Sequence, residues 1–246
     1  MSLDARRARL WHRLGLGPVW CERLAPGTGG DEDGQHGAAE GTTGSVTAVT
    51  RMDWDELERT VAGCTACGLC KTRTQTVFGV GSRQSQWMVI GEAPGAEEDL
   101  RGAPFVGQAG RLLDSILSAA GLGRAGSGPS AVYIANVLKC RPPGNRNPEA
   151  SEVARCEPYL MRQVELLAPR VILVMGRFAA QALLGSDASI AALRGRAHRI
   201  EVAGVSVPVI VTYHPAYLLR NLADKSKVWA DLCLARDIFE SAASIS

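Results

Sequence analysis

Apolar runs alternate with amphipathic helical patterns along most of the chain after residue 50. Four short apolar runs bounded by turn-forming residues predict strands. They cover residues 87–90, 132–138, 171–175 and 207–212. Between them, apolar residues recur at every third or fourth position, which predicts helices. This order predicts a doubly wound α/β domain with a mainly parallel four-stranded sheet and helices on both faces.

Capping residues predict where several helices begin and end. Asp53 is followed three positions later by Glu56, which is the pattern of a capping box at a helix start. Gly121 is predicted to end the helix before the second strand, since glycine is common just beyond helix ends. Asn147 and Pro148 are predicted as N-cap and first residue of a long helix.

The first 46 residues differ from the rest in composition. Residues 25–46 are rich in glycine, acidic and small polar side chains, and such a segment cannot bury enough apolar surface to fold. We therefore predict a flexible extension and linker at 1–46 and one folded domain at 47–246. The whole chain is 46% hydrophobic and 21% charged, as in soluble globular proteins. It has no long apolar run or signal segment, so we expect a cytoplasmic protein without a membrane partner.

Charge alone does not identify a partner for this chain. The formal net charge is +2, which is too small to indicate nucleic acid by itself. Basic residues do cluster near three predicted loops. These clusters are Lys139, Arg141 and Arg146; Arg194, Arg196, His198 and Arg199; and Arg220, Lys225 and Lys227. Taken alone, they are better explained as an ordinary solvated surface.

The seven cysteines point to a metal site. In a reducing compartment, cysteines act as metal ligands, reactive thiols or buried side chains more often than as disulfides. Cys64 and Cys67 form a C-x-x-C pair, and Cys140 and Cys156 follow at a predicted strand end and in the next helix. Four thiolates suit zinc or an iron-sulfur cluster, and their spacing does not separate the two. Cys70 leaves the choice of ligands open.

Three segments place polar residues where predicted parallel strands end, which is where ligands bind in such sheets. They are GEAPGAEEDLRGAPFVGQAGRLLD at 91–114, NVLKCRPPGNRNP at 136–148 and HPAYLLR at 214–220. Together with the cysteines, these segments resemble the family 4 uracil-DNA glycosylases, the thermostable, iron-sulfur-containing type of bacteria and archaea. The resemblance covers nearly everything after residue 60.

This resemblance implies a monofunctional hydrolase with a uracil-DNA glycosylase-like fold. Such an enzyme flips uracil out of DNA, hydrolyses its N-glycosidic bond and leaves an abasic site. The family carries a 4Fe-4S cluster on residues at the places of Cys64, Cys67, Cys140 and Cys156, which favours iron-sulfur over zinc. The implied partner is uracil-containing DNA, single- or double-stranded. We expect a monomer in the bacterial cytoplasm.

Each motif then has a chemical task. His214, at the place of the family's leaving-group histidine, is expected to donate a hydrogen bond to uracil O2. The backbone N–H groups of Glu92 and Ala93 are expected to point at the same oxygen. Asn136 is expected to pair with uracil N3–H and O4, and cytosine presents the reverse pattern. Phe105 is expected to stack on the flipped base.

The first loop also supplies Gly91 to the predicted substrate site and two candidate catalytic carboxylates, Glu92 and Glu98. In the best-known uracil glycosylases an aspartate orients the attacking water, but Ala93 stands at that position here. Glu98 is a candidate for steadying the water, for stabilising the sugar cation or for filling the space of the thymine methyl group. The sequence does not choose among these roles.

DNA contacts are expected from two further loops. Arg141 and Arg220 are predicted to contact phosphates, and Leu218 or Leu219 to insert into the gap that the flipped base leaves. One alternative function is a non-hydrolytic iron-sulfur protein that binds DNA or uracil, which would keep Phe105 and Asn136 but need neither His214 nor Glu98. A zinc-stabilised nucleotide-binding α/β protein is another alternative.

Overall fold

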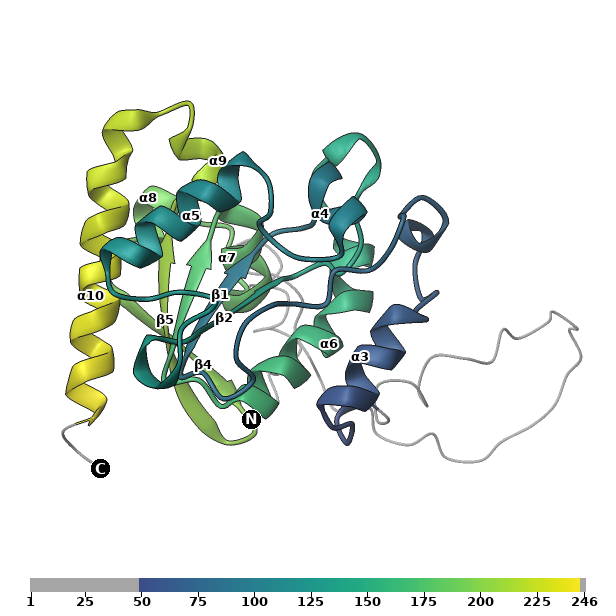
Figure 1. Cartoon of the computed structure of the whole chain (residues 1–246), viewed down its shortest axis with the longest axis horizontal. Coiled ribbons are helices and arrows are strands. Elements are labelled where there is room, and N and C mark those ends of the chain that lie inside the picture. Colours follow the sequence, from purple (N-terminus) through teal and green to yellow (C-terminus); the bar gives the residue numbers. More distant parts are fainter. Residues whose placement is uncertain (1–48, 244–246) are drawn as a thin grey trace, which may run out of the picture. The chain divides into compact units, whose positions relative to one another are not determined.

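The computed structural model describes residues 49–243, so the predictions made for residues 1–46 lie outside the described part. A five-stranded sheet with the order β2-β1-β3-β5-β4 forms its centre (Figure 1). The strands are β1 (Trp87–Gly91), β2 (Val132–Asn136), β3 (Val171–Met175), β4 (Ala197–Val202) and β5 (Val205–Thr212). The pairs β1–β2, β1–β3 and β3–β5 are parallel, whereas β4 is antiparallel to β5.

The mainly parallel sheet confirms the prediction, but the predicted number of four strands was wrong. The added strand, β4, forms a hairpin with β5 through Ala203 and Gly204, whose φ angles are 50° and 78°. Only Ile200 and Val202 of β4 are buried. Because this edge strand alternates buried with exposed positions, it contains no continuous apolar run and escaped the sequence pattern.

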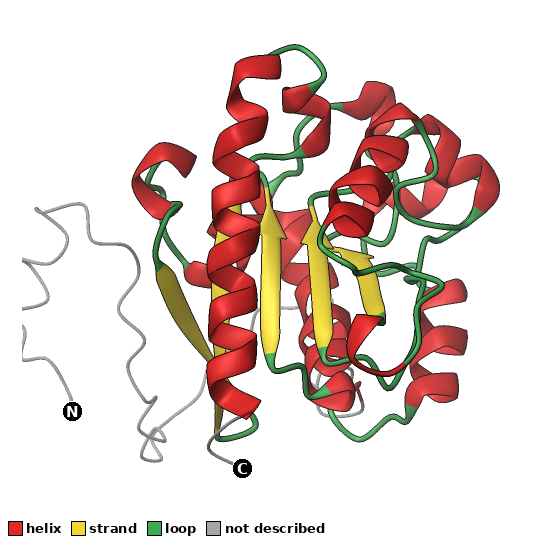
Figure 2. Ribbon diagram, turned by 60° about the vertical axis from the view of Figure 1, so that its left-hand side comes forward, coloured by secondary structure: helices red, strands yellow, loops and turns green. Residues whose placement is uncertain are grey.

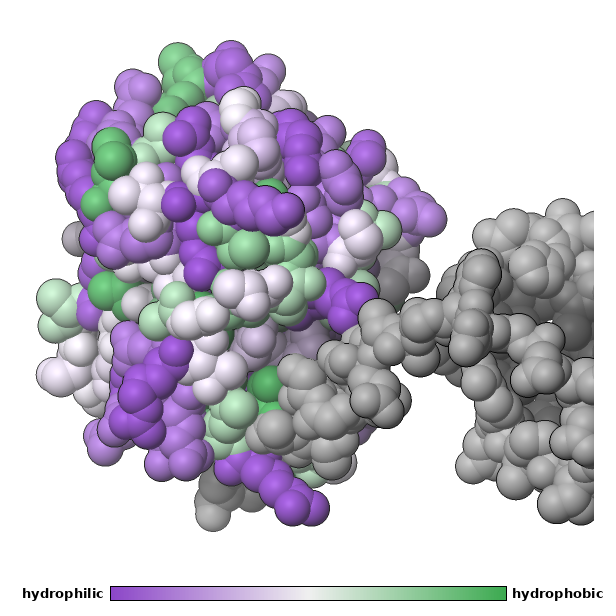
Figure 3. Space-filling view, turned by 90° about the vertical axis from the view of Figure 1, so that its right-hand side faces the viewer, coloured by the Kyte–Doolittle hydropathy of each residue, from purple (hydrophilic) through white to green (hydrophobic). Residues whose placement is uncertain are grey.

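Helices cover both faces of the sheet, as predicted. On one face pack α5 (Gln108–Ala119) and α10 (Lys225–Ala243), and α10 runs along the strands in Figure 2. On the other face pack α6 (Ala150–Leu167) and α7 (Arg177–Leu184). Helix α3 (Trp54–Ala62) packs against α6. On the side that carries α3, hydrophilic side chains are interspersed with neutral and hydrophobic ones (Figure 3).

The remaining elements are short and sit mainly in the loops around the sheet. The α-helical ones are α4 (Ala96–Arg101), α8 (Ile190–Leu193) and α9 (Pro215–Leu218). The 3₁₀ turns are η1 (Gly68–Lys71), η2 (Gly128–Ser130), η3 (Pro143–Asn145) and η4 (Leu222–Asp224). Of these, α4, η3 and α9 follow the carboxyl ends of β1, β2 and β5. No helix in the described part is long and apolar enough to cross a membrane.

The predicted caps are confirmed at one helix and shifted at another. The Asp53 side chain accepts hydrogen bonds from the first turn of α3, including the backbone N–H of Glu56 at 2.8 Å. Helix α6 begins later than predicted, with Glu149 rather than Asn147 as its N-cap. The reason is a second capping box, in which the Glu152 carboxylate accepts from the Glu149 N–H at 2.9 Å.

Candidate active site

A cleft of about 520 Å³ lies at the carboxyl ends of the parallel strands. The loops after β1, β2 and β5 and the segment before α5 contribute to its lining. It brings together residues that the sequence predicted for one site. These are Glu92, Ala93, Glu98, Phe105, Asn136 and His214. The strand ends gather them because parallel strands present all their carboxyl ends at one edge.

The floor of the cleft depends on a glycine. Strands β1 and β2 pair with Gly91 opposite Asn136, the last residue of β2. A Cβ atom on Gly91 would lie 2.5 Å from Oδ1 of Asn136 and 2.5 Å from Cζ of Phe105. Gly91 does not itself line the cleft, but its missing side chain leaves room for two residues that do.

A buried lysine supports Asn136 from behind. Lys139 was predicted within a surface cluster of cations, but it is 1% exposed. Its Nζ donates to the Asn136 carbonyl oxygen at 2.8 Å and to Oε1 of Gln163 at 2.6 Å. Burial lowers the pKa of Lys139 to about 8, because removal from water penalises the charged ammonium. The ammonium is held by two acceptors, as a buried cation requires.

His214 is held as a neutral hydrogen-bond donor. It is the N-cap of α9, and its Nδ1 accepts from the Ala216 backbone N–H at 3.1 Å. The proton of the neutral ring must therefore reside on Nε2. Burial lowers the pKa of His214 to about 4, with Glu98 opposing the shift and Arg220 reinforcing it. The imidazole is accordingly neutral at pH 7. Its ring stacks on Phe105, with centroids 5.4 Å apart.

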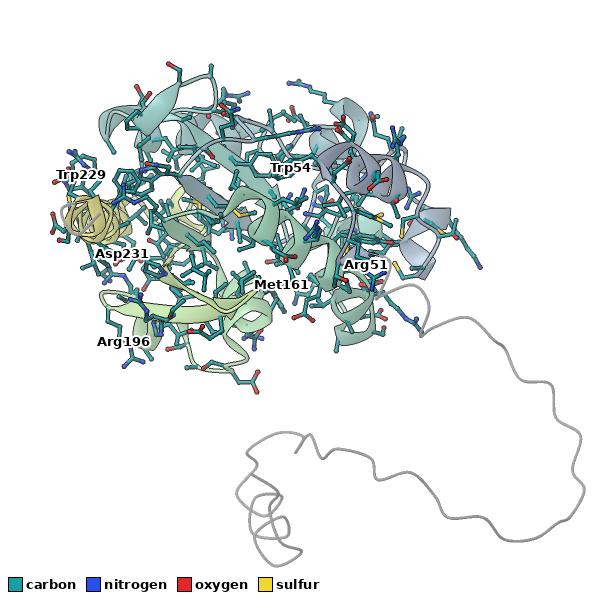
Figure 4. The ribbon with its side chains drawn as sticks, turned by 90° about the horizontal axis from the view of Figure 1, so that it is seen from below. Arg51, Trp54, Met161, Arg196, Trp229 and Asp231 are labelled. Carbon is teal, nitrogen blue, oxygen red and sulfur yellow. The ribbon has the colours of Figure 1, made fainter. Side chains whose placement is uncertain are left out.

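The strand that leads to His214 is anchored at its end. Thr212, the last residue of β5, donates from Oγ1 to Oδ2 of the fully buried Asp231 at 2.7 Å. Asp231 also pairs with Arg194 at 2.9 Å. Figure 4 shows Asp231 on the inner side of α10 and Trp229 on the outer side. This buried ion pair fixes the end of β5 two residues before the histidine.

Glu98 uses both of its carboxylate oxygens to hold the loop. Its Oε1 accepts from the backbone N–H groups of Val106 at 2.9 Å and Gly107 at 3.2 Å. Its Oε2 accepts from the Gly95 N–H at 3.1 Å. These three bonds join the start of α4 to the segment that precedes α5. The arrangement favours a positioning role for Glu98 over direct contact with water.

Glu92 is free to face a reactant. Its carboxylate makes no hydrogen bond with the residues that the structure describes, although it lines the cleft. Burial raises the pKa of this carboxyl group, and Arg177 partly opposes the shift. The backbone N–H groups of Glu92 and Ala93 likewise donate to no acceptor in the described part. All three groups therefore remain available to a ligand.

Five cysteines line a second, smaller pocket between the end of α3, the loop after β2, and α6. They are Cys64, Cys67, Cys70, Cys140 and Cys156. In the view from below, sulfur atoms gather at the end of the domain where α3 lies (Figure 4). No group of three or more His, Cys, Asp or Glu side chains within residues 49–243 could hold a metal ion as placed.

Three of these sulfur atoms accept hydrogen bonds. Arg73 Nη1 donates to Cys140 at 3.1 Å, and the Tyr159 hydroxyl donates to Cys64 at 3.4 Å. The backbone N–H of Lys139 donates to Cys156 at 3.2 Å. Burial raises the pKa of Cys156 to about 12. These donors would stabilise thiolates, the form in which cysteine binds metals.

Known proteins match this chain over the region that contains the cleft residues. A sequence profile of the Uracil DNA glycosylase superfamily matches residues 78–233. The type-4 uracil-DNA glycosylase of Archaeoglobus fulgidus is 45% identical over 169 residues, which cover 67% of this chain and 82% of that protein. The type-4 enzyme of Pyrobaculum aerophilum is 41% identical over 74% of this chain and 93% of its own length. That of Thermotoga maritima is 43% identical over 67% and 82%.

The chain belongs to the type-4 uracil-DNA glycosylases. The family predicted from the segments at 91–114, 136–148 and 214–220 is therefore confirmed. The fold predicted for that family is confirmed as well, with the added edge strand β4. The individual roles of the site residues in this member of the family remain proposals.

The residues predicted to contact DNA lie in different environments in this type-4 fold. Arg220 is exposed at the cleft, and Arg141 is half-buried with its Nε on Oδ1 of Asn145 at 2.8 Å. Leu218 is fully buried in α9, which packs against α5. Its side chain is part of the core in this structure, and insertion of Leu218 or Leu219 into DNA stays a prediction. Leu219 is only partly buried.

Sequence reasoning missed several contributors to the cleft. Asn145 lines it from η3, Arg146 from the position just after η3, and Tyr217 from α9. All three lie inside the motifs that indicated the type-4 family. The available signal was therefore their place beside Pro142 and His214, and they were passed over because each also fits an ordinary polar loop.

Proposed function

We propose that this chain releases uracil from DNA by hydrolysing the bond between uracil N1 and deoxyribose C1′. The observation that carries the proposal is the meeting of the Asn136 amide and the neutral His214 imidazole in one cleft beside Phe105. These are the groups needed to read and stabilise a flipped uracil. Membership of a family whose relatives are named uracil-DNA glycosylases supports it.

Asn136 supplies the base discrimination. Its amide oxygen accepts from uracil N3–H, and its amide nitrogen donates to O4. Cytosine presents an acceptor at N3 and a donor at C4, so both pairs would fail. Each buried polar group left unpaired costs about 1–3 kcal/mol. The support from Lys139 fixes the backbone from which the amide projects.

His214 stabilises the leaving group. As the C1′–N1 bond breaks, its electron pair moves onto uracil and negative charge collects at O2. The Nε2–H of the neutral His214 donates to this oxygen and keeps its proton. The N–H groups of Glu92 and Ala93 add two donors. Each such donor contributes about 2.7–4 kcal/mol of transition-state stabilisation.

Glu92 orients the attacking water. Its carboxylate lines the cleft without a hydrogen bond to any described residue, whereas both oxygens of Glu98 are occupied by backbone N–H groups. The water oxygen bonds to C1′, and Glu92 accepts the proton that the water releases. The raised pKa of Glu92 favours this proton uptake.

An iron-sulfur cluster on Cys64, Cys67, Cys140 and Cys156 is part of the proposal. The donor set fits such a cluster because these cysteine sulfurs line one pocket and three of them accept hydrogen bonds. When bound, the cluster would cross-link the segment between α3 and η1 to the loop after β2 and to α6. Iron content and visible absorption would test this, since zinc gives neither.

Uracil-containing DNA in either strand state is the proposed substrate, and a cytoplasmic monomer is the proposed form. The alternative, a protein that binds DNA or uracil without hydrolysis, would retain Asn136 and Phe105 but gain nothing from a free Glu92. Turnover separates the two functions.

The test uses purified protein and oligonucleotides with one uracil, single- and double-stranded, followed by alkaline cleavage of abasic sites. We expect cleavage at the uracil, and a loss of about 100-fold or more in kcat for His214→Ala. Absence of cleavage by folded, iron-loaded protein would refute the proposed activity. DNA binding measured on the same samples would then distinguish a non-hydrolytic binder.

A further inference from the structure

Phe105 lies in a backbone conformation that aromatic residues rarely adopt. Its φ angle is 53°, in the left-handed region, where the Cβ atom crowds the backbone. The ring is nevertheless 5% exposed and lies against His214 at the cleft. Such strain persists only when the surrounding structure enforces it.

Arg124 donates hydrogen bonds to the peptide groups on both sides of the Phe105 Cα atom. Its Nη1 donates to the Pro104 carbonyl oxygen at 3.0 Å, and its Nη2 donates to the Phe105 carbonyl oxygen at 3.0 Å. Its Nε donates to Oδ1 of Asp114 at 2.9 Å, which orients the guanidinium plane from α5. A planar fork can hold two acceptors at once, whereas a lysine ammonium is a single point charge.

Two further contacts leave the loop little freedom. A Cβ atom on Gly110 would lie 1.8 Å from the Phe105 carbonyl oxygen, so the start of α5 presses directly on this peptide. Glu98 holds the next two backbone N–H groups, those of Val106 and Gly107. Arg124 is thus the group that holds the two carbonyl oxygens, and Glu98 holds the amides that follow.

We propose that Arg124 is a positioning residue for uracil release, because it holds Phe105 in the left-handed conformation that places its ring in the cleft. Arg124 does not itself line the cleft, so it acts through Phe105. The inference rests on the proposed function for its kinetic test, but not for its structural one. Without the fork, Phe105 relaxes toward negative φ and its ring leaves the base-stacking position.

The kinetic test is a double-mutant cycle of Arg124→Gln and Phe105→Ala. We expect each single variant to lower kcat/KM for uracil release by about 10- to 100-fold, the range set by loss of one base–aromatic stack. In the Phe105→Ala background, Arg124→Gln should lower it by no more than about 2-fold further. A purely structural arginine would instead give effects that multiply, and that result would overturn the proposal.

Two further variants sharpen the test. Arg124→Lys keeps the charge but not the fork, so it should resemble Arg124→Gln rather than wild type. If Arg124→Gln does not fold, Arg124→Lys takes its place in the cycle. Arg111→Gln is the matched control, because Arg111 is an exposed arginine on α5 whose side chain makes no hydrogen bond or ion pair within the described residues. Its kcat/KM should equal that of wild type.

Crystal structures of wild type and Arg124→Gln test the positioning role of Arg124 independently of the proposed uracil release. If wild type releases no uracil, the proposed function fails while the structural question stays open to measurement. We expect a positive φ at Phe105 in wild type and a negative φ in the variant, with the ring moved from His214. A Phe105 that keeps its φ and its ring contact without the guanidinium would overturn the role of Arg124.

Discussion

The backbone N–H of Ala216 donates to Nδ1 of His214 at 3.1 Å. The sequence explains this bond, because Pro215 occupies the first helical position and has no N–H. The N–H of Ala216 is then the first unpaired donor of α9 and takes the histidine as its cap. One local motif thus fixes both the orientation of the imidazole and its tautomer.

We predict that stability declines as pH falls from about 6.5 to about 4. The pKa of His214 is about 4 in the fold and 6.5 without its surroundings, so the unfolded chain binds more protons within this window. The contribution of His214 is fully present above about 6.5 and is lost as pH falls through the window. Urea unfolding at pH 7 and pH 4.5 measures it. If the free energy of unfolding of His214→Asn depends on pH as steeply as that of wild type, the prediction is contradicted.

Glu92→Gln is predicted to reduce catalysis, whereas Glu98→Gln is predicted to reduce stability. Glu92→Gln should lower kcat by about 100-fold with little change in stability, since only a water and its proton depend on this carboxylate. Glu98→Gln should lower the free energy of unfolding, because a charged acceptor of three N–H groups is lost. Glu97→Gln is the control, since among the described residues Glu97 forms its ion pair with Arg101 on the surface. Equal kcat for Glu92→Gln and wild type would remove Glu92 from the mechanism.

Asn136→Asp is predicted to shift base preference. An aspartate can accept but not donate hydrogen bonds. It would therefore lose the bond to uracil O4 and could accept one from the exocyclic amine of cytosine. Uracil release should fall by about 100-fold or more, while the ratio of cytosine to uracil release rises. Asn147→Asp, an exposed change in the loop after β2, controls for added charge. An unchanged ratio, measured with matched oligonucleotides, would count against base reading by Asn136.

Gly91→Ala is predicted to abolish most activity. The new methyl group would lie 2.5 Å from both Asn136 and Phe105, so at least one of them must move. We expect kcat/KM to fall by about 100-fold, in keeping with a displacement of about 1 Å at a reacting site. Gly63→Ala provides the comparison, because its Cβ would meet nothing closer than 3.8 Å. Similar kinetics for the two variants would show that the crowding at Gly91 is harmless.

The leucines near the cleft are predicted to divide into core and DNA-contacting residues. Leu218→Ala should lower the free energy of unfolding by about 2–5 kcal/mol, as for other buried leucines. Leu222 is 62% exposed, and Leu219 is partly exposed. Leu219→Ala and Leu222→Ala should leave stability unchanged, and the inserting residue should lose activity on double-stranded more than on single-stranded DNA. Equal losses on both substrates would exclude insertion by either.

Sequence patterns predicted the parts of this fold that rest on local chemistry. The Asp53 cap and the four apolar strands follow from short-range preferences, and the structure contains them. Strand β4 was missed because His198, Arg199 and Glu201 interrupt its apolar positions. Such an edge strand is stabilised by pairing with β5 rather than by its own composition.

The same limit applies to the site. The resemblance of their segments to the family predicted one site for His214 and Asn136, and the structure brings both side chains to the cleft. Lys139 and Arg124 were not predictable, since a basic residue in a loop gives no sign that its cation will be buried or will hold carbonyl oxygens. The burial of Leu218 could not be predicted from the sequence either. Leu218 and Leu219 are adjacent leucines, and the orientation of the short helix α9 decides which of them faces the core.

Catalytic activity depends on the register in which β1 pairs with β2. Gly91 faces Asn136 in that register, and a shift of one residue would turn Asn136 to the opposite face of the sheet. A molecule with slipped strands could remain compact and still present no amide to uracil. The fraction of refolded protein that is active therefore reports the yield of one specific strand alignment, which spectroscopic measures of sheet content would not distinguish.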